Sequence, residues 1–185
     1  MDIASAKQQI KNTVQIYLQK DALGRYRLPL VHQRPIFLLG APGLGKTAIM
    51  QQVADEMGLG LVSYSMTHHT RQSALGLPVI VEKEYGGKHY QVSEYTMSEI
   101  IASVYDCMRT TGKTQGILFL DEINSMDTAM QAKLLKALEE QKVRRIGGRE
   151  DIHFDVRIVC ASNEDPEALV EQGRLRSDFY YRIGV

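Results

Sequence analysis

Hydrophobic positions along the chain follow two alternating patterns. Short apolar runs are typical of parallel strands buried on both faces, and stretches with apolar residues every three or four positions are typical of amphipathic helices. The predicted strands are residues 36–39, 61–65, 117–120 and 156–161. The predicted helices are the first twenty or so residues and residues 46–57, 97–108, 125–141 and 166–172. This alternation predicts an α/β fold with helices on both faces of a parallel sheet.

Two further segments have the pattern of β-hairpins. The first covers residues 79–92 and turns at Gly86-Gly87, because consecutive glycines readily adopt the positive φ angles of a tight turn. The second joins residues 143–146 to residues 152–154 through Gly147-Gly148. Both interrupt the alternation of strands and helices, so we expect them to be insertions into the sheet scaffold.

The composition fits one domain with a buried core. The chain has 185 residues, 44% of them hydrophobic, and its 22 basic and 22 acidic residues give a formal net charge of zero. Zero net charge argues against a protein whose main task is to coat nucleic acid, although a local basic patch would be compatible with it. The sequence has no signal peptide or membrane-spanning run, and Cys107 and Cys160 have no disulfide or metal spacing. We expect a cytoplasmic protein that does not enter a membrane.

The segment GAPGLGKT, residues 40–47, matches the phosphate-binding pattern G-x-x-x-x-G-K-[ST] in full. It lies between a predicted strand and a predicted helix, as the motif requires, so an ordinary glycine turn is the weaker interpretation. Backbone N–H groups and the helix N-terminus would hold phosphate oxygens, Lys46 would reach the β- and γ-phosphates, and Thr47 would ligate Mg²⁺. The ligand predicted is ATP with Mg²⁺. The predicted nucleotide-binding residues are Gly40, Ala41, Pro42, Gly43, Leu44, Gly45, Lys46, Thr47, Ala48 and Asp121.

Polar residues follow two of the predicted strands. Asp121-Glu122 comes directly after residues 117–120, so both carboxylates are expected at the carboxyl edge of the sheet, beside the phosphate loop. Asp121 is placed to hold Mg²⁺, and Glu122 to act as general base for the water that attacks the γ-phosphate. Alone, the pair would equally fit a helix cap. Asn163 follows residues 156–161 and is a candidate for orienting that water, although an asparagine there also fits a turn.

These motifs, in this order, resemble those of the AAA+ ATPases. GAPGLGKT resembles the Walker A segment, ILFLDE the Walker B segment and VRIVCASNE the sensor 1 segment. The resemblance implies a three-layer αβα sandwich around a five-stranded parallel sheet, working in a self-associated ring, commonly a hexamer. It divides the chain into an N-terminal helix and lead-in loop, residues 1–33, and a nucleotide-binding core, residues 34–185. The family continues into a small helical lid, which we expect to be absent from a chain that stops at Val185.

Two branches of this family share features with the chain. The stretches LLKALEEQKVRRIGG and GRLRSDFYYRIGV resemble bacterial enhancer-binding transcription activators. In those proteins the arginines that match Arg176 and Arg182 act on the nucleotide of the neighbouring subunit. The activators also carry a GAFTGA loop, and no such sequence occurs here. Residues 66–80, with Gly76-Leu77-Pro78 before the first hairpin, resemble instead the MoxR-type branch of chaperone-like remodelers, which we favour.

The leading hypothesis is an ATP-hydrolysing AAA+ motor that remodels protein partners. Its expected catalytic residues are Glu122, Lys46, Asn163, Arg182 and Arg176. A transcription-activator module and a nucleotide-gated assembly switch stay open as alternatives. A motor that acts on DNA is a further alternative, which the zero net charge disfavours.

Three other features carry weaker signals. His68-His69 fits a polar loop better than a metal site, because no third ligand follows at a suitable spacing. The arginines of the second hairpin, residues 144, 145 and 149, fit a solvated turn or, in a ring, a surface facing the central pore. Ser65 stands where proteins of this family often keep a polar residue that restrains the catalytic glutamate.

Overall fold

A computed structural model describes residues 2–68, 78–95, 99–140, 142–144, 151–153 and 155–183. The helices are α1 (Ile3–Leu18), α2 (Lys46–Met57), α4 (Glu99–Thr111), α5 (Thr128–Glu140), α6 (Pro166–Glu171) and α7 (Ser177–Ile183). The strands are β1 (Ile36–Leu39), β2 (Gly60–Ser65), β3 (Pro78–Tyr85), β4 (Lys88–Tyr95), β5 (Gly116–Asp121), β6 (Lys142–Arg144), β7 (Asp151–His153) and β8 (Val156–Ser162). Short 3-10 helices occupy Leu30–His32, Met66–His68 and Ile123–Ser125. Within the described ranges, no helix is long and apolar enough to cross a membrane.

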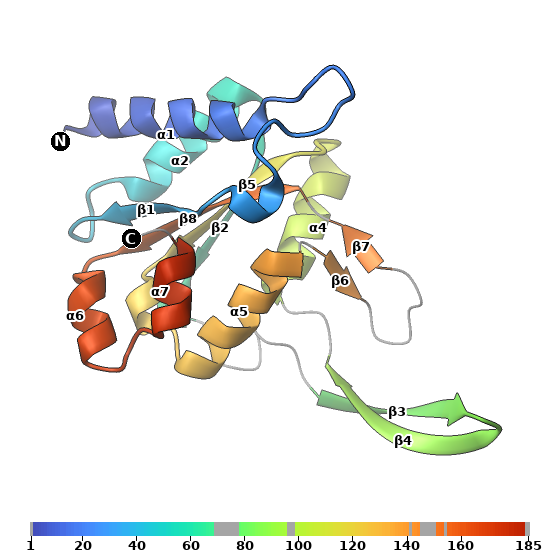
Figure 1. The fold of residues 1–185 in the computed structure, drawn as a ribbon. Helices are drawn as coiled ribbons and strands as arrows, with labels where there is room; N and C mark the ends of the chain where they lie inside the picture. Colours follow the sequence, from blue (N-terminus) through green and yellow to red (C-terminus); the bar gives the residue numbers. More distant parts are fainter. Residues whose placement is uncertain are drawn as a thin grey trace.

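The central sheet is parallel and has the strand order β1-β8-β5-β2. Helices α1 and α2 lie on one side of it, and α4, α5 and α7 on the other (Figure 1). The predicted α/β sandwich is therefore confirmed. The predicted count of five strands is corrected to four among the described residues. The sequence contains four apolar strand segments, each of which forms one of these strands, and the fifth was expected from the family resemblance alone.

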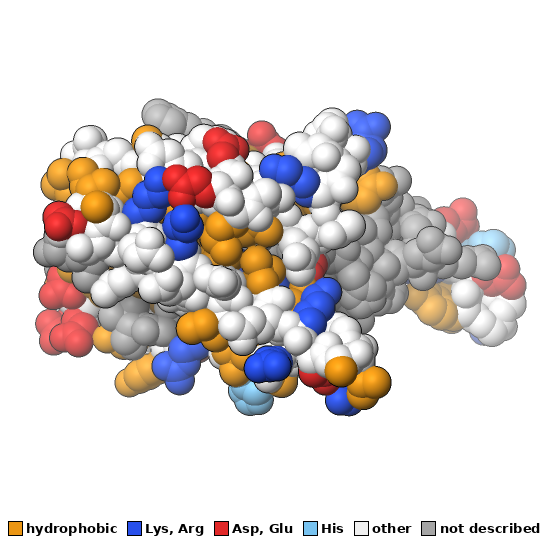
Figure 2. All heavy atoms as spheres, turned by 90° about the horizontal axis from the view of Figure 1, so that it is seen from above, with side chains coloured by type: hydrophobic (Ala, Val, Ile, Leu, Met, Phe, Trp, Pro, Cys, Tyr) orange, Lys and Arg blue, Asp and Glu red, His pale blue; other side chains and the backbone are white. Residues whose placement is uncertain are grey.

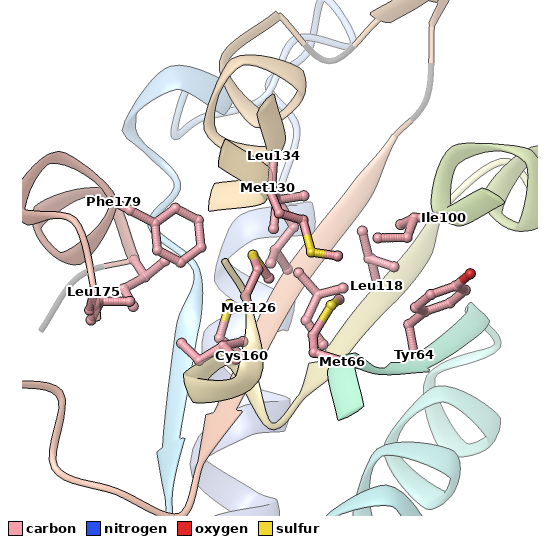
Figure 3. Packing of buried hydrophobic residues seen from close by; sticks show 14 of the residues in the cluster. Tyr64, Met66, Ile100, Leu118, Met126, Met130, Leu134, Cys160, Leu175 and Phe179 are labelled. Carbon is pink, nitrogen blue, oxygen red and sulfur yellow. The ribbon is translucent and has the colours of Figure 1, made fainter. Parts of the chain in front are cut away.

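Side chains of the central strands alternate between two hydrophobic clusters, because successive residues of a strand point to opposite faces. Ile117 and Phe119 of β5 pack on the side of α1 and α2, in a cluster that includes Ile10 and Val14 of α1. Leu118 of β5 packs on the other side, against residues of α4, α5 and α7 (Figure 3). Both faces of the sheet are thus covered, and α1 belongs to one covering layer.

Charged side chains of both signs lie close together on the surface above α1 and α2 (Figure 2). Lys7 and Lys11 of α1 approach Glu56 of α2 at 2.5 and 2.7 Å. Hydrogen bonds from Lys11 and Lys7 lower the pKa of Glu56 to about 2. Exposed pairs of this kind contribute little to stability, so the apolar contacts of Ile10 and Val14 hold α1 in place more strongly.

The first predicted hairpin is confirmed. Strands β3 and β4 pair antiparallel and turn at Gly86 and Gly87, whose φ angles are +60° and +76°. The hairpin projects away from the sheet in both views (Figures 1 and 2). Strands β6 and β7 also pair antiparallel, as predicted. The glycine pair at 147–148 and the arginines at 145 and 149 lie outside the described residues, as do His69 and Gly76-Leu77.

Two helices differ from the sequence prediction. Helix α5 begins at Thr128, because residues 123–125 form a 3-10 turn and the Asp127 carboxylate accepts a hydrogen bond from the Met130 N–H at 2.8 Å. Helix α7 was not predicted. It has only seven residues. Two tyrosines follow Phe179 directly, so the sequence shows a run of aromatic residues and no clear helical spacing. Phe179 and Ile183, four positions apart, are its buried residues.

Candidate functional site

The phosphate loop has the backbone geometry that its glycines predict. Gly43 and Gly45 adopt φ angles of +79° and +75°. A Cβ on either residue would meet nothing within 4 Å, so the positive φ angle, and not crowding, is what requires glycine there. No side chain caps the start of α2 at Gly45. The first N–H groups of that helix therefore remain for an anionic ligand.

Lys46 folds back over this loop. Its ammonium Nζ donates hydrogen bonds to the carbonyl oxygens of Gly40 and Ala41, both at 3.1 Å. Phosphate oxygens can replace these carbonyls and form stronger, charge-assisted bonds with the same nitrogen. The loop and its lysine thus fit a nucleotide phosphate chain.

The carboxyl ends of β1, β5 and β8 bring the predicted site residues to one edge of the sheet. The N–H of Gly40 donates to the carbonyl of Ser162 at 3.0 Å, which ties the phosphate loop to the end of β8. Asp121 ends β5, and exposed Asn163 follows β8 directly. The structure therefore brings the phosphate loop, Asp121 and Asn163 together, as the strand pattern predicts.

Glu122 has an unusual backbone. Its φ and ψ angles are 56° and 47°, and it is the only residue other than glycine with a positive φ among the described residues. This left-handed conformation costs a residue with a side chain about 1–2 kcal/mol. The turn is held by a hydrogen bond of 3.0 Å from the Glu122 N–H to the Asp121 carboxylate.

Ser65 contacts the carboxylate of Glu122. Its hydroxyl lies 3.1 Å from Glu122 Oε2 and 2.9 Å from the Thr67 hydroxyl. The parallel register pairs Ser65 with Asp121, which places the serine beside the acidic pair. The contact expected from the position of Ser65 is therefore present. Its effect on hydrolysis remains a prediction.

A polar network that the sequence did not reveal lies behind Asn163. The guanidinium of Arg174 donates to both carboxylate oxygens of Glu164 at 2.6 and 2.9 Å, and to the carbonyl of Asn124 at 3.4 Å. The Asn124 amide donates to the same carboxylate at 2.8 Å. Hydrogen bonds from Arg174 and Asn124 lower the pKa of Glu164. Arg174 is thus engaged within its own subunit.

The two candidate arginines occupy different surroundings. Arg176 is exposed, and its guanidinium pairs with Asp178 through two hydrogen bonds of 2.9 and 2.6 Å. The hydrogen bond from Arg176 lowers the pKa of Asp178. Arg182 instead lines a small cavity of about 20 Å³ with Pro35 and Val156, at the amino ends of β1 and β8. This is the end of the sheet opposite the phosphate loop, so the structure does not place Arg182 in its own nucleotide site.

Sequence reasoning missed three residues of this region: Gln131, Asn124 and Glu164. Gln131 is fully buried in α5 and bonds to the backbone of Arg174 and Arg176. It lies on the apolar stripe of that helix beside Met130. A polar residue on such a stripe indicates a buried side chain that needs hydrogen-bond partners, and the sequence contains this information.

A cavity of about 380 Å³ adjoins the phosphate loop. It lies between α1, β1 and the loop, and apolar side chains, including Ile3, Ile10 and Leu44, line much of it. Lys46 and Gly40 form one end of it. Its size and lining suit a flat, largely apolar group attached to the phosphates.

The donors at the sheet edge suit Mg²⁺ with phosphate better than a cage made only of protein. In the described part of the chain, no group of three or more His, Cys, Asp or Glu side chains could hold a metal ion. Mg²⁺ is usually bound by one or two protein oxygens together with phosphates and water. Thr47 and Asp121 can supply such oxygens at this edge.

Comparison with known proteins extends over part of the chain. Residues 109–185 match the family model described as Sigma-54 interaction domain. Over 70 residues, 38% of this chain, the sequence is 53% identical to the transcriptional activator RocR of Bacillus subtilis (strain 168), covering 15% of that protein. It is 50% identical over 70 residues, also 38% of this chain, to the response regulator protein PilR of Pseudomonas aeruginosa, covering 16% of it. The chain thus spans less than a fifth of the length of these relatives.

Two solved structures share the fold, one over the full length of this chain and the other over 82% of it. The crystal structure of NtrX from Brucella abortus with ATP matches 100% of this chain and 36% of the NtrX chain. The TM-score is 0.61 and the sequence identity is 19%. The structure of NtrX with ADP matches 82% of this chain and 31% of its own, with a TM-score of 0.57 and 22% identity. These comparisons confirm that this chain resembles AAA+ P-loop proteins. They also confirm that part of it resembles enhancer-binding activators. The relatives named here are regulators, and the preference for the MoxR-type branch remains a prediction without support among them.

The strained backbone of Glu122 gives a prediction about stability. In the variant Glu122→Gly the left-handed conformation carries no steric cost, so we expect the free energy of unfolding to rise by about 0.5–1 kcal/mol. Urea denaturation monitored by circular dichroism measures this change. Glu122→Gln is the matched control, because it keeps the side chain and should unfold like the parent. A less stable Glu122→Gly variant would contradict the strain argument.

Proposed function

We propose that this chain is the AAA+ motor domain of a bacterial transcription activator, which binds ATP with Mg²⁺ and hydrolyses it between subunits of a ring. The observation that carries the proposal is the convergence of the phosphate loop, Asp121-Glu122 and Asn163 at one sheet edge. The activator assignment is supported by the match of residues 109–185 to Sigma-54 interaction domains. The ATP in the NtrX structure supports the choice of nucleotide.

Nucleotide binding uses residues 40–48. The left-handed glycines at 43 and 45 turn backbone N–H groups toward the phosphates, and the uncapped start of α2 adds its partial positive charge. When the nucleotide binds, the Lys46 ammonium exchanges its hydrogen bonds to the Gly40 and Ala41 carbonyls for hydrogen bonds to phosphate oxygens. The cavity beside α1 accepts the adenine base.

Hydrolysis depends on positioning and electrostatics. Glu122 accepts a proton from the attacking water, and Asn163 orients that water through its amide. Ser65 holds the Glu122 carboxylate by the 3.1 Å hydrogen bond until the water is in place. Thr47 and Asp121 hold Mg²⁺, which neutralises phosphate charge when it is bound.

The arginines complete the site from a second subunit. A guanidinium near the transferring phosphoryl group stabilises charge in the transition state. Arg182 lies at the opposite end of the sheet from its own phosphate loop, and in the described part of the chain the exposed Arg176 pairs with the neighbouring carboxylate of Asp178. Both are therefore better suited to the nucleotide of a neighbour in the ring. The family resemblance makes a hexamer the expected assembly.

A protein-remodeling motor of the MoxR type is the second candidate. The observation that favours it is the β3–β4 hairpin, which stands away from the sheet (Figure 1). This hairpin lies outside the residues that match the Sigma-54 interaction domain, and the sequence lacks GAFTGA. The partner would then be another protein, recognised through this insertion.

Exchange of the general base tests the hydrolysis proposal. In Glu122→Gln the amide cannot accept the proton, so we expect turnover to fall by at least about 100-fold while ATP affinity stays near that of the parent. Steady-state phosphate release and equilibrium binding of a fluorescent ATP analogue measure the two quantities. Lys46→Ala is the control that should lose binding. Parent-like turnover in Glu122→Gln would exclude Glu122 as the base.

Mixing variants tests whether active sites are shared. Arg182→Ala subunits have an intact phosphate loop, and Lys46→Ala subunits have an intact arginine, so neither alone should turn over ATP. An equal mixture should recover about a quarter of the parent rate, because one site in four then combines both intact parts. Absence of recovery in mixtures that are shown to assemble would contradict sharing through Arg182.

The partner can be tested with the same base variant. Glu122→Gln loaded with ATP should be held in its ATP state and should co-purify with RNA polymerase that carries sigma-54, but not with polymerase that carries another sigma factor. ADP-loaded protein is the control. If neither polymerase is retained, the activator proposal fails, and deletion of residues 78–95 then tests the remodeling alternative against protein clients.

A further inference from the structure

The side chain of Gln131 is fully buried in α5 and uses both ends of its amide. Its Nε2 donates to the carbonyls of Met126 at 2.9 Å and Arg174 at 2.7 Å. Its Oε1 accepts from the N–H of Arg176 at 2.8 Å. Its exposed fraction is 0%. Burial of an unsatisfied amide is strongly destabilising, so these three backbone contacts account for a polar residue in this place.

Two of the contacts hold the segment 174–176 between α6 and α7. The N–H groups of Arg174 and Leu175 both donate to the carbonyl of Leu169, at 2.9 and 3.0 Å. Leu175 is buried and points toward the core beside Met126 (Figure 3). The backbone on each side of Leu175 is therefore anchored, from α6 by Leu169 and from α5 by Gln131.

The two arginines of this segment differ in how firmly their side chains are held. Arg174 donates two hydrogen bonds to Glu164, which is 10 residues away in sequence. It also donates one to the carbonyl of Asn124, which is 50 residues away. The partner of the Arg176 guanidinium is Asp178, two residues along the chain, in an exposed pair. Because exposed ion pairs contribute little to stability, Arg176 can exchange this carboxylate for a phosphate at little cost.

We infer that Gln131 is a positioning residue for Arg176, which acts on the nucleotide of a neighbouring subunit. The inference rests on the proposed function. A side chain as flexible as arginine directs its guanidinium to a phosphate only from a fixed backbone, and misplacement by about 1 Å can cost 10²-fold in rate. Gln131 supplies this fixed point. The role requires an amide of this length: glutamate lacks the two donors, leucine lacks all three contacts, and asparagine is one methylene shorter.

The test compares Gln131→Leu with Arg176→Ala and the parent, all in the full chain. We expect Gln131→Leu to lower kcat by about 10- to 100-fold and to leave affinity for the fluorescent ATP analogue unchanged, since its own phosphate loop is intact. Gln8→Leu, an exposed glutamine on α1, is the matched control and should behave as the parent. If Gln131→Leu fails to fold by circular dichroism, Gln131→Met, which is unbranched like glutamine and also lacks the three contacts, serves in its place.

Two further measurements separate positioning from a general structural effect. Mixing Gln131→Leu subunits with Lys46→Ala subunits should restore turnover, because the second kind supplies a correctly held arginine. In the double variant with Arg176→Ala, the glutamine change should cost little beyond Arg176→Ala alone. Failure of rescue, or fully additive losses, would overturn the role of Gln131.

The remaining outcomes distinguish this inference from the proposed function. If Arg176→Ala loses turnover and is rescued by mixing while Gln131→Leu keeps parent kcat, the inference is wrong and the proposed function stands. If the parent shows no turnover, or Arg176→Ala retains all of it, the proposal for Arg176 fails and the role of Gln131 fails with it.

Discussion

The parallel pairing of β8 with both β1 and β5 is the constraint on which the rest of the site depends. It aligns three carboxyl ends, so that the chain leaves the sheet at Gly40, Asp121 and Ser162 along one edge. The hydrogen bond from the Gly40 N–H to the Ser162 carbonyl continues the ladder beyond the strands and fixes the phosphate loop relative to Asn163. Strands β5 and β8 are buried along almost their whole length, with hydrophobic cover on both faces, and close packing around them makes their alignment rigid.

Backbone strain is distributed unevenly along this edge. Positive φ angles at Gly43 and Gly45 carry no steric penalty, because glycine lacks Cβ. The same conformation at Glu122 costs stability, and it stands directly after Asp121, at the point where the chain leaves β5. The Ser65 hydroxyl then fixes the Glu122 carboxylate. A strained backbone and a restraining hydrogen bond thus act together on one side chain.

Features encoded locally could be predicted from the sequence. Apolar runs predict the four strands, the glycines at 43 and 45 predict the phosphate loop, and alternation of strands with helices predicts the layers. The contact of Ser65 with Glu122 was expected from the family resemblance and not from the strand pattern. The contacts of Gln131 and Glu164 could not be predicted in the same way, since their partners lie up to 45 residues away. Such contacts depend on where α5 and the segment before α7 lie in space, and periodicity in one segment does not report that.

The arrangement of charges explains why one subunit would form an incomplete site. The phosphate loop and the two carboxylates lie at one edge of the sheet, but among the described residues neither Arg174 nor Arg182 is directed to it. Arg174 is engaged by Glu164, and Arg182 lies at the far end of the sheet. Arg176 is exposed, and its partner among the described residues is the nearby carboxylate of Asp178, so a phosphate from another subunit can compete for it. If the nucleotide supplies that phosphate, binding at one subunit favours contact with the next, and the same guanidinium serves assembly and catalysis. A rigid segment at 174–176 would then serve two purposes. Both the subunit interface and the transition state require the Arg176 guanidinium at a fixed place.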